Sequence, residues 1–303
     1  MLPHHSAGSK VVLTGLIGRD ILASRSRWLH EREAVAHGIE LRYELIDFSA
    51  RGWDDAQLSE TLAELQAGAY AGVNVTHPFK QAVLPYLDSL SDDAQQIGAV
   101  NTISFIGGKR RGYNTDMSGF AESLRLGLPQ ACLDRVVQLG AGGAGSATAY
   151  ALLNSGVKKL DIFEENMARA RVLCNKLSAS FTGQVAVVTD LRQALDRCDG
   201  IVNATPVGMV KYPGSPVPIS LLRSHHWVAD IVYFPLETEL LSAAARVGCQ
   251  ILNGGGMAVG QAAAAFDIFT GIIADRARMA RSFTEFAIPA DDILPATVWA
   301  PAR

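Results

Sequence analysis

Short apolar runs alternate along this chain with longer segments in which apolar residues recur every three or four positions. Short runs predict β-strands and the longer period predicts amphipathic helices, so the alternation is typical of an α/β protein. In the first part of the chain we expect strands at 11–13, 41–46 and 73–75, and helices at 28–37 and 56–67. Two further strands, at 100–105 and 111–114, flank Gly107-Gly108 and predict a hairpin.

A second strand–helix series begins near Asp134. Its predicted strands lie at 136–139, 160–163, 185–188, 200–204 and 227–233, with helices between them. Gly156 is suited to end the first of these helices, because glycine tolerates the left-handed backbone of a helix C-terminus. A strongly helical segment at 257–270 follows, whereas residues 288–303 contain three prolines and no periodicity and predict a tail. With 303 residues, the chain is long enough for two domains.

Composition narrows the class of protein. Hydrophobic residues make up 49% of the chain and charged residues 19%, as in an ordinary globular protein with a filled core. A net charge of −3 gives no electrostatic support for a nucleic-acid or membrane partner. No apolar run approaches the ~20 residues that span a bilayer, and the first residues lack the features of a secretion signal. We therefore expect a cytoplasmic protein.

Cysteine and histidine usage predicts no metal site. The cysteines are scattered without CxxC spacing, which predicts buried thiols in a reducing compartment. They are Cys132, Cys174, Cys198 and Cys249. The histidines form no HExxH or other ligand pattern, and we expect the pair His225-His226 to be solvated.

The segment Gly140-Ala141-Gly142-Gly143-Ala144-Gly145 follows a predicted strand directly and opens a predicted helix. A GxGxxG pattern is weak when it stands alone, but this strand–loop–helix context is what a dinucleotide-binding loop requires. Its glycines permit a tight turn, close approach of a pyrophosphate and tight helix packing, while the helix N-terminus donates N–H groups to the phosphates. The alternative is a tight structural turn.

Glu164 ends the second strand of this series, about where an acidic residue would hold the ribose hydroxyls of a dinucleotide. A carboxylate there repels the 2′-phosphate of NADP. No arginine adjoins it in the sequence, since Arg169 and Arg171 are expected further along, on the following helix. The sequence therefore favours NAD over NADP as the cofactor. The alternative is that Glu164 or Glu165 caps that helix.

Lys80 closes the segment Asn74-Val75-Thr76-His77-Pro78-Phe79-Lys80. Pro78 suits the first position of a helix, which would place Lys80 in the first turn, at the positive end of the helix dipole. That environment favours the neutral amine that a general base needs, whereas an ordinary lysine with a pKa of ~10.4 is protonated at neutral pH. An isolated lysine would instead be a solvated surface residue.

The segments Asn74–Lys80, Asn101-Thr102 and Asn114–Asp116 occur together with the glycine loop, and on these motifs the chain resembles the shikimate/quinate dehydrogenase family from Leu13 to about Thr270. The resemblance implies an α/β fold in which an N-terminal substrate domain is followed by a Rossmann dinucleotide-binding domain, with a C-terminal helix returning to the first. The implied boundaries are 1–115 for the substrate-binding catalytic domain, completed by 252–287, then 116–251 for the NAD(P)-binding domain and 288–303 for the tail.

Site residues are implied by the same resemblance, position by position. The implied catalytic pair is Lys80 and Asp116. The implied substrate-binding residues are Ser24, Ser26, Asn74, Thr76, Asn101, Tyr233 and Gln261. The implied cofactor-binding residues are Gly140, Ala141, Gly142, Gly143, Ala144, Gly145, Glu164, Asn203, Thr205, Pro206, Met209 and Gly256.

The implied activity is reversible, NAD-dependent oxidation of shikimate, with quinate as a further substrate, to the 3-dehydro product. The residue types agree with this chemistry, because Lys80 can take the hydroxyl proton while Asp116 orients the hydroxyl, and Ser, Thr and Asn suit a polyhydroxylated ring. Two features depart from the usual family pattern. Arg27 replaces a proline after the SxS motif, Ser24-Arg25-Ser26, and either holds a carboxylate or points to solvent. His77 replaces an aliphatic residue.

Alternatives remain open at this stage. His77 and Glu164 favour the NAD-using quinate/shikimate branch, whereas Ser26 in place of threonine favours shikimate. An aminoshikimate or mainly quinate dehydrogenase is an alternative within the family. A ligand-sensing regulator without turnover would have no need of Lys80 together with Asp116, and a folate-type dehydrogenase would have no use for the SxS loop. The expected partner is a small cyclic hydroxy acid, and a homodimer is among the options.

Overall fold

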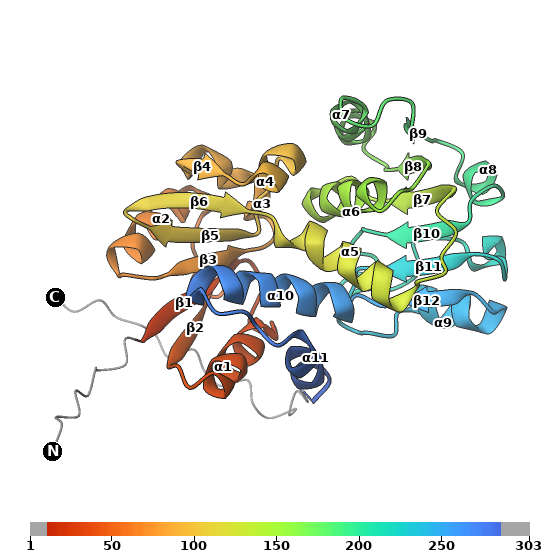
Figure 1. Cartoon of the computed structure of the whole chain (residues 1–303). Coiled ribbons are helices and arrows are strands. Elements are labelled where there is room, and N and C mark those ends of the chain that lie inside the picture. The colour runs from red at the N-terminus through yellow and green to blue at the C-terminus, as the bar shows by residue number, and fades with distance from the viewer. Residues whose placement is uncertain (1–10, 286–303) are drawn as a thin grey trace, which may run out of the picture.

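Two sheets of six strands each account for the alternating pattern of the chain (Figure 1). This computed structural model describes residues 11–285. The predicted tail at 288–303 lies outside the described residues. The mixed α/β class predicted from the sequence is confirmed.

The first sheet has the strand order β2-β1-β3-β5-β6-β4. Its strands are β1 (Val12–Gly18), β2 (Leu41–Asp47), β3 (Gly72–Val75), β4 (Ser89–Leu90), β5 (Thr102–Ile106) and β6 (Lys109–Tyr113). Strand β1 runs parallel to β2 and β3, whereas β5 and β6 form the predicted antiparallel hairpin. The accompanying helices are α1 (Ser26–Ala36), α2 (Leu58–Ala67), α3 (Phe79–Ala82) and α4 (Asp92–Ile97), with 3₁₀ turns η1 (Asp55–Gln57) and η2 (Leu84–Tyr86).

The second sheet has the order β12-β11-β10-β7-β8-β9, and all of its neighbouring strands are parallel. This is the strand order of dinucleotide-binding α/β sheets. Its strands are β7 (Arg135–Leu139), β8 (Lys159–Phe163), β9 (Val185–Val187), β10 (Gly200–Asn203), β11 (Trp227–Asp230) and β12 (Gln250–Leu252). Its helices are α6 (Gly143–Asn154), α7 (Met167–Ser178), α8 (Leu191–Leu195) and α9 (Glu239–Val247), with a 3₁₀ turn η3 (Ile219–Leu221).

Two long helices, α5 (Thr115–Gly127) and α10 (Gly255–Thr270), run side by side between the two sheets (Figure 1). Glycines allow their backbones to touch: a Cβ on Gly119 would lie 2.8 Å from the Met257 carbonyl oxygen, and one on Gly260 would lie 2.9 Å from the Gly119 Cα. Helix α11 (Arg276–Glu285) then packs against α1. The chain thus returns to its first sheet.

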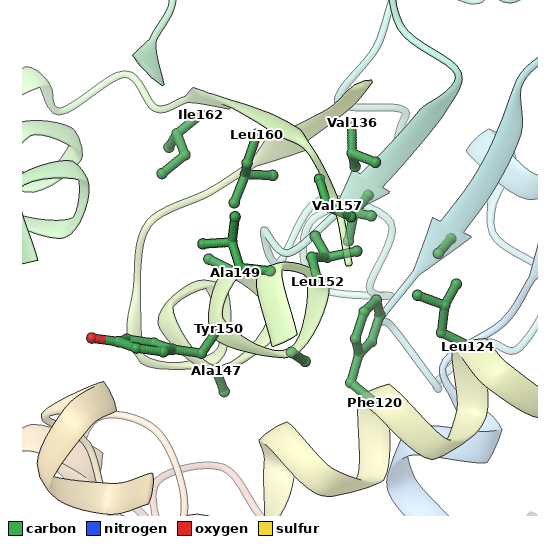
Figure 2. Packing of buried hydrophobic residues seen from close by; sticks show 14 of the residues in the cluster. Phe120, Leu124, Val136, Ala147, Ala149, Tyr150, Leu152, Val157, Leu160 and Ile162 are labelled. Atoms are coloured by element: carbon green, nitrogen blue, oxygen red, sulfur yellow. The ribbon is translucent and has the colours of Figure 1, made fainter. Parts of the chain in front are cut away.

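Helix α5 also belongs to the core of the second half. Figure 2 shows Phe120 and Leu124 of α5 packed towards the same buried cluster as Val136, Leu152 and Val157. Burial of such large apolar side chains stabilises a fold by about 1.5–3 kcal/mol each. This packing fixes the orientation of α5, and therefore of the residues at its N-terminus.

Several details differ from the sequence predictions. Strand β11 ends at Asp230, before the predicted end at 233, and helices α4, α5 and α11 were not predicted. His226 is buried, not solvated, and its Nε2 lies 3.1 Å from the Leu195 carbonyl oxygen, which replaces water as its partner. Cys132 is exposed and Cys174 half-buried, so only Cys198 and Cys249 are buried thiols. Within residues 11–285, no helix is long and apolar enough to cross a membrane.

Candidate active site

Lys80 and Asp116 meet where the two halves join. The Lys80 Nζ lies 2.6 Å from the Asp116 Oδ2, and their side chains are 19% and 7% exposed. Lys80 belongs to α3, directly after β3, and Asp116 is the second residue of α5. The Asn114 side chain caps α5 by accepting the Met117 N–H at 3.3 Å, which fixes the turn that carries Asp116. The implied catalytic pair is therefore in direct contact.

The helix that carries Lys80 is shorter than the sequence suggested. Helix α3 has four residues, and Pro78 is its N-cap, not its first helical residue, after a cis His77–Pro78 peptide bond. A single turn sums few peptide dipoles, so the predicted dipole effect on Lys80 has little structural basis. The strongest charge beside Lys80 is the Asp116 carboxylate.

Two of the predicted substrate residues from the first half, Asn74 and Asn101, share one line of hydrogen bonds. The Asn74 Nδ2 donates to the Thr102 Oγ1 at 3.0 Å, and the Thr102 hydroxyl donates to the Asn101 Oδ1 at 3.1 Å. The Asn101 Nδ2 donates to the Thr115 Oγ1 at 2.9 Å, and the Thr115 hydroxyl donates to the Gln261 carbonyl oxygen at 3.1 Å. Because Thr115 precedes Asp116, this line ends beside the Lys80–Asp116 pair.

Ser24 and Ser26 form a local hydrogen-bonded turn before α1. The Ser24 hydroxyl donates to the Ser26 Oγ at 3.1 Å, and the Ser26 N–H donates to the Ser24 Oγ at 3.2 Å. The buried Asp47 carboxylate anchors the start of this loop by accepting the backbone N–H groups of Asp20 at 3.1 Å and Ile21 at 2.7 Å. The loop is therefore held by the end of β2.

Thr76, Tyr233 and Gly256 lie around the same junction. The Thr76 N–H donates to the Ile17 carbonyl oxygen at 2.9 Å, which fixes Thr76 beside the end of β1. Tyr233 follows β11, is 42% exposed, and lies edge-on to Phe283 with ring centroids 6.4 Å apart. A Cβ on Gly256 would collide with the Ser123 Oγ, so the packing of α10 on α5 requires this glycine.

The glycine loop has the geometry that a dinucleotide needs. Gly140 has a φ of +96°, and a Cβ there would lie 2.7 Å from the Ala204 carbonyl oxygen. A Cβ on Gly145 would lie 2.5 Å from the Gly140 carbonyl oxygen. At Gly142, the N-cap of α6, a Cβ would meet nothing within 4 Å, so the helix N-terminus is open to a phosphate. These residues fit a bound dinucleotide.

Gly143 connects this loop to the Lys80–Asp116 pair. A Cβ on Gly143 would lie 3.6 Å from both the Cβ and the Cδ of Lys80. Ala141 is buried, and Ala144 is the second residue of α6. The N-terminus of α6 therefore lies against the lysine stem.

Glu164 is tied to the glycine loop. Its Oε2 accepts the Ala141 N–H at 2.9 Å, and its Oε1 accepts the Asn166 N–H at 3.0 Å. Helix α7 is capped by the Asn166 side chain, not by Glu164. Arg169 lies on the following helix, as expected, but the first turn of α7 brings its Nη1 to 3.9 Å from the Glu164 Oε2.

Asn203 organises the segment after β10. Its Nδ2 donates to the Asp230 Oδ1 at 2.9 Å, and its Oδ1 accepts the Thr205 N–H and hydroxyl at 3.0 and 2.7 Å. Burial raises the pKa of the Asp230 carboxyl to about 6. Pro206 and Met209 are exposed on this segment.

The same segment reaches the first half. The Lys211 Nζ lies 3.0 Å from the Asp20 Oδ2, in an exposed ion pair between the segment after β10 and the loop after β1. Exposed ion pairs of this kind stabilise a structure by at most about 1 kcal/mol.

Sequence reasoning assigned no role to three residues of the hydrogen-bonded line. Thr102 follows Asn101, and Thr115 follows Asn114. Their position next to these asparagines was the sequence feature that could have identified them. The third is Tyr43, whose hydroxyl donates to the Asn74 Oδ1 at 2.8 Å from a strand two positions away in the sheet. No local pattern points to that contact.

Arg27 does not point freely into solvent. Arg27 is an exposed residue, but its Nε donates to the Tyr43 carbonyl oxygen at 2.8 Å. The residue that replaces the family's proline therefore binds β2.

Comparison with known proteins agrees with this geometry. Residues 16–103 match the family model of the shikimate dehydrogenase substrate binding domain. The chain is 47% identical over 276 residues to a shikimate dehydrogenase (NADP(+)) of Arthrobacter sp. strain FB24, covering 90% of this chain and 94% of that one. It is 44% identical over 277 residues to a quinate/shikimate dehydrogenase (NAD(+)) of Corynebacterium efficiens, covering 90% and 97%.

Solved structures show the same two-domain arrangement. Quinate dehydrogenase from Corynebacterium glutamicum in complex with NAD superposes with a TM-score of 0.85 at 43% identity, over 91% of this chain and all of that one. Sequence, fold and site geometry together show that the chain belongs to the shikimate/quinate dehydrogenase family, oxidoreductases that act on an alcohol group.

Proposed function

We propose that this enzyme catalyses the NAD-dependent, reversible oxidation of shikimate to its 3-dehydro product and also accepts quinate. The observation that carries the proposal is the position of the Lys80–Asp116 pair, 2.6 Å apart, against the N-terminus of α6 at Gly143. A proton acceptor and a dinucleotide loop are thus adjacent, as oxidation of a secondary alcohol requires.

The chemistry divides between the cofactor and the chain. Bound NAD⁺ supplies the hydride acceptor. The Lys80 amine takes the proton of the substrate hydroxyl and becomes an ammonium, while the Asp116 carboxylate accepts a hydrogen bond and orients that hydroxyl. Because its Oδ2 lies 2.6 Å from the Lys80 Nζ, the Asp116 carboxylate would stabilise the ammonium that the reaction creates. In the reverse direction, the Lys80 ammonium returns the proton to the oxygen.

Substrate recognition is assigned to short polar side chains around this pair. We propose that the Ser24 and Ser26 hydroxyls hold the substrate carboxylate and that amide and hydroxyl groups hold the ring hydroxyls, because each ring hydroxyl both donates and accepts hydrogen bonds. The latter groups are those of Asn74, Thr76, Asn101, Tyr233 and Gln261. The support for Asn74 and Asn101 is the hydrogen-bonded line that joins their side chains and ends at the backbone carbonyl of Gln261.

The preference for NAD rests on Glu164. Its carboxylate is fixed on the glycine loop by the Ala141 N–H, at the end of the second strand where ribose hydroxyls are held in this fold. Arg169 could attract a 2′-phosphate, but it faces Glu164 at 3.9 Å, and Glu165 adds a second negative charge beside it. Two acids against one arginine favour the cofactor without that phosphate.

Steady-state assays test the proposal. Purified protein is given shikimate, quinate or aminoshikimate with either NAD⁺ or NADP⁺, and growth of the reduced-nicotinamide absorbance is followed. The largest kcat/KM is expected for shikimate with NAD⁺, with measurable quinate turnover. A larger value with NADP⁺ would contradict the cofactor assignment, and a larger value with aminoshikimate would contradict the substrate assignment.

A further inference from the structure

Tyr43 lies at the edge of the first sheet, yet it is only 2% exposed. The outer backbone groups of an edge strand have no neighbouring strand to pair with. Here side chains of helix α1 pair with both the N–H and the carbonyl oxygen of Tyr43. The Tyr43 N–H donates to the Glu31 Oε1 at 3.0 Å, and its carbonyl oxygen accepts the Arg27 Nε–H at 2.8 Å. Because Arg27 and Glu31 are four residues apart, they lie on one face of α1. Tyr43 is therefore clamped to the helix that Ser26 begins.

The side chain of Tyr43 points the other way, towards β3. Its hydroxyl donates to the Asn74 Oδ1 at 2.8 Å. Burial raises the pKa of this phenol, and the nearby Ser26 side chain acts in the opposite direction. Its ring stacks on His30 with centroids 4.7 Å apart. One hydroxyl thus lies between the serine turn that begins α1 and the asparagine that starts the hydrogen-bonded line.

We propose that Tyr43 is a positioning residue that sets the spacing between the Ser24–Ser26 hydroxyls and the Asn74 amide, and thereby selects a ring acid that spans both. The inference rests on the proposed function, because those two groups are the ones assigned to the substrate carboxylate and to a ring hydroxyl. Tyr43 acts through its neighbours and does not itself need to touch the substrate.

The physical basis is the orientation of the Asn74 amide. Its Nδ2 is held by Thr102, but its Oδ1 is held by the Tyr43 hydroxyl. Without that donor the buried acceptor loses its partner, and the amide is free to rotate towards another donor. Ser26 loses its phenol neighbour at the same time. The serine turn and the Asn74 amide, which form the two ends of the proposed substrate-binding surface, then lose the hydroxyl that lies between them.

Tyr43→Phe removes only this hydroxyl and retains the ring that stacks on His30. The matched control is Tyr70→Phe, because the Tyr70 hydroxyl donates to Glu44 of the same strand, in the cluster on the other face of the sheet. We expect the KM and the calorimetric dissociation constant for shikimate to rise about tenfold in Tyr43→Phe, the worth of one buried hydrogen bond. The KM for NAD⁺ should stay unchanged, kcat should fall less than twofold, and the control should match the wild type.

A double-mutant cycle separates positioning from general stability. If Tyr43 acts through Asn74, Tyr43→Phe should weaken shikimate binding far less when Asn74→Ala is already present. Equal effects in both backgrounds would overturn the inference. So would a Tyr43→Phe protein that melts earlier than Tyr70→Phe but binds shikimate as the wild type does.

A second variant covers the case in which Tyr43→Phe does not fold. Arg27→Met removes the clamp on the Tyr43 carbonyl and keeps an aliphatic stem, with the exposed Arg42→Met as its control. A selective rise in the shikimate dissociation constant is expected, and no rise would overturn the inference. Wild-type turnover is measured first: if no ring acid is oxidised, the proposed function fails, whereas turnover with unaffected variants rejects only the role of Tyr43.

Discussion

The two sides of the active site use different parts of the polypeptide. The substrate side consists of hydrogen-bonded polar side chains: Ser24 bonds Ser26, and a separate line runs from Tyr43 through Asn74 to Thr115. The nucleotide side consists of glycines, backbone N–H groups and one anchored carboxylate, Glu164. Ring hydroxyls need directional donors and acceptors, whereas phosphates are matched by the backbone of a helix N-terminus. The substrate side should therefore be sensitive to the loss of polar atoms, and the nucleotide side to the addition of carbon atoms.

The largest effect is expected where the two sides meet, at Lys80. Lys80→Ala removes the proposed proton acceptor, and loss of a general base lowers rates by about 10²- to 10⁴-fold. We expect kcat to fall within that range while the shikimate dissociation constant changes little. The exposed Lys109→Ala on the β5–β6 hairpin is the matched control. A raised KM with unchanged kcat would show that Lys80 only binds substrate.

Two alanine substitutions in the glycine loop separate folding from cofactor binding. Gly145→Ala places a methyl group 2.5 Å from the Gly140 carbonyl oxygen, so it should destabilise the protein by about 1–3 kcal/mol in urea unfolding. Gly142→Ala meets no protein atom within 4 Å and should leave the free energy of unfolding nearly unchanged. It should nevertheless raise the KM for NAD⁺ about tenfold or more, because the methyl group occupies the approach of the pyrophosphate. Unchanged NAD⁺ affinity in Gly142→Ala would contradict the assigned position of the cofactor.

Replacing the anchored carboxylate should alter cofactor preference. Glu164→Gln keeps a hydrogen-bond acceptor for the Ala141 N–H and removes the charge that repels a 2′-phosphate. The ratio of kcat/KM for NADP⁺ to that for NAD⁺ should rise about tenfold, which corresponds to about 1.4 kcal/mol. Glu237→Gln, an exposed acid that hydrogen-bonds Ser242, serves as the control. A ratio that does not move would show that discrimination lies elsewhere.

A smaller effect of pH should be specific to the substrate side. Neither ring nitrogen of the buried His30 has a hydrogen-bond partner among residues 11–285, and burial lowers its pKa to about 3. The unfolded chain, with a histidine pKa of ~6.5, therefore binds a proton that the folded chain does not. This contribution to stability is complete above pH 6.5 and decreases as the pH falls, by about 1 kcal/mol between pH 6.5 and 5.5.

The variant His30→Leu isolates this effect. Asp230 shifts stability in the opposite direction, since its raised pKa favours the folded state as the pH falls towards 4, but it does so in both proteins. Urea unfolding at pH 7.5, 6.5 and 5.5 should show the wild type losing about 1 kcal/mol relative to the variant over the last step. A difference that stays constant with pH would show that His30 is protonated in the folded protein.

The two sides also differ in how well the sequence predicts them. The glycine loop was found from its strand–loop–helix context, because a local backbone conformation leaves a local pattern. The contact between Tyr43 and Asn74 joins residues 31 positions apart on strands that flank β1, so no short motif contains it. Asp116 and Lys80 were predicted as a pair only through family resemblance.

Two details of the site have local physical causes that the sequence did not show. Pro78 was placed inside a helix, but only one helical turn follows it, so the predicted dipole could not form. Arg169 lies on the following helix, as expected, and the start of α7 at Met167 turns the chain back so that the guanidinium lies 3.9 Å from the Glu164 carboxylate. The domain boundaries and the roles of individual site residues remain predictions.

In the proposed reaction, hydride would pass directly from the substrate carbon to NAD⁺ at the junction that holds Lys80 and Asp116. The most direct measurement uses shikimate carrying deuterium on the carbon that bears the oxidised hydroxyl, with NAD⁺ in ordinary water. Mass spectrometry of the reduced cofactor should show one deuterium per molecule, because the hydride carries the label and Lys80 removes only the hydroxyl proton. Reduced cofactor without deuterium, with the label found in the solvent, would rule out direct hydride transfer from the substrate carbon.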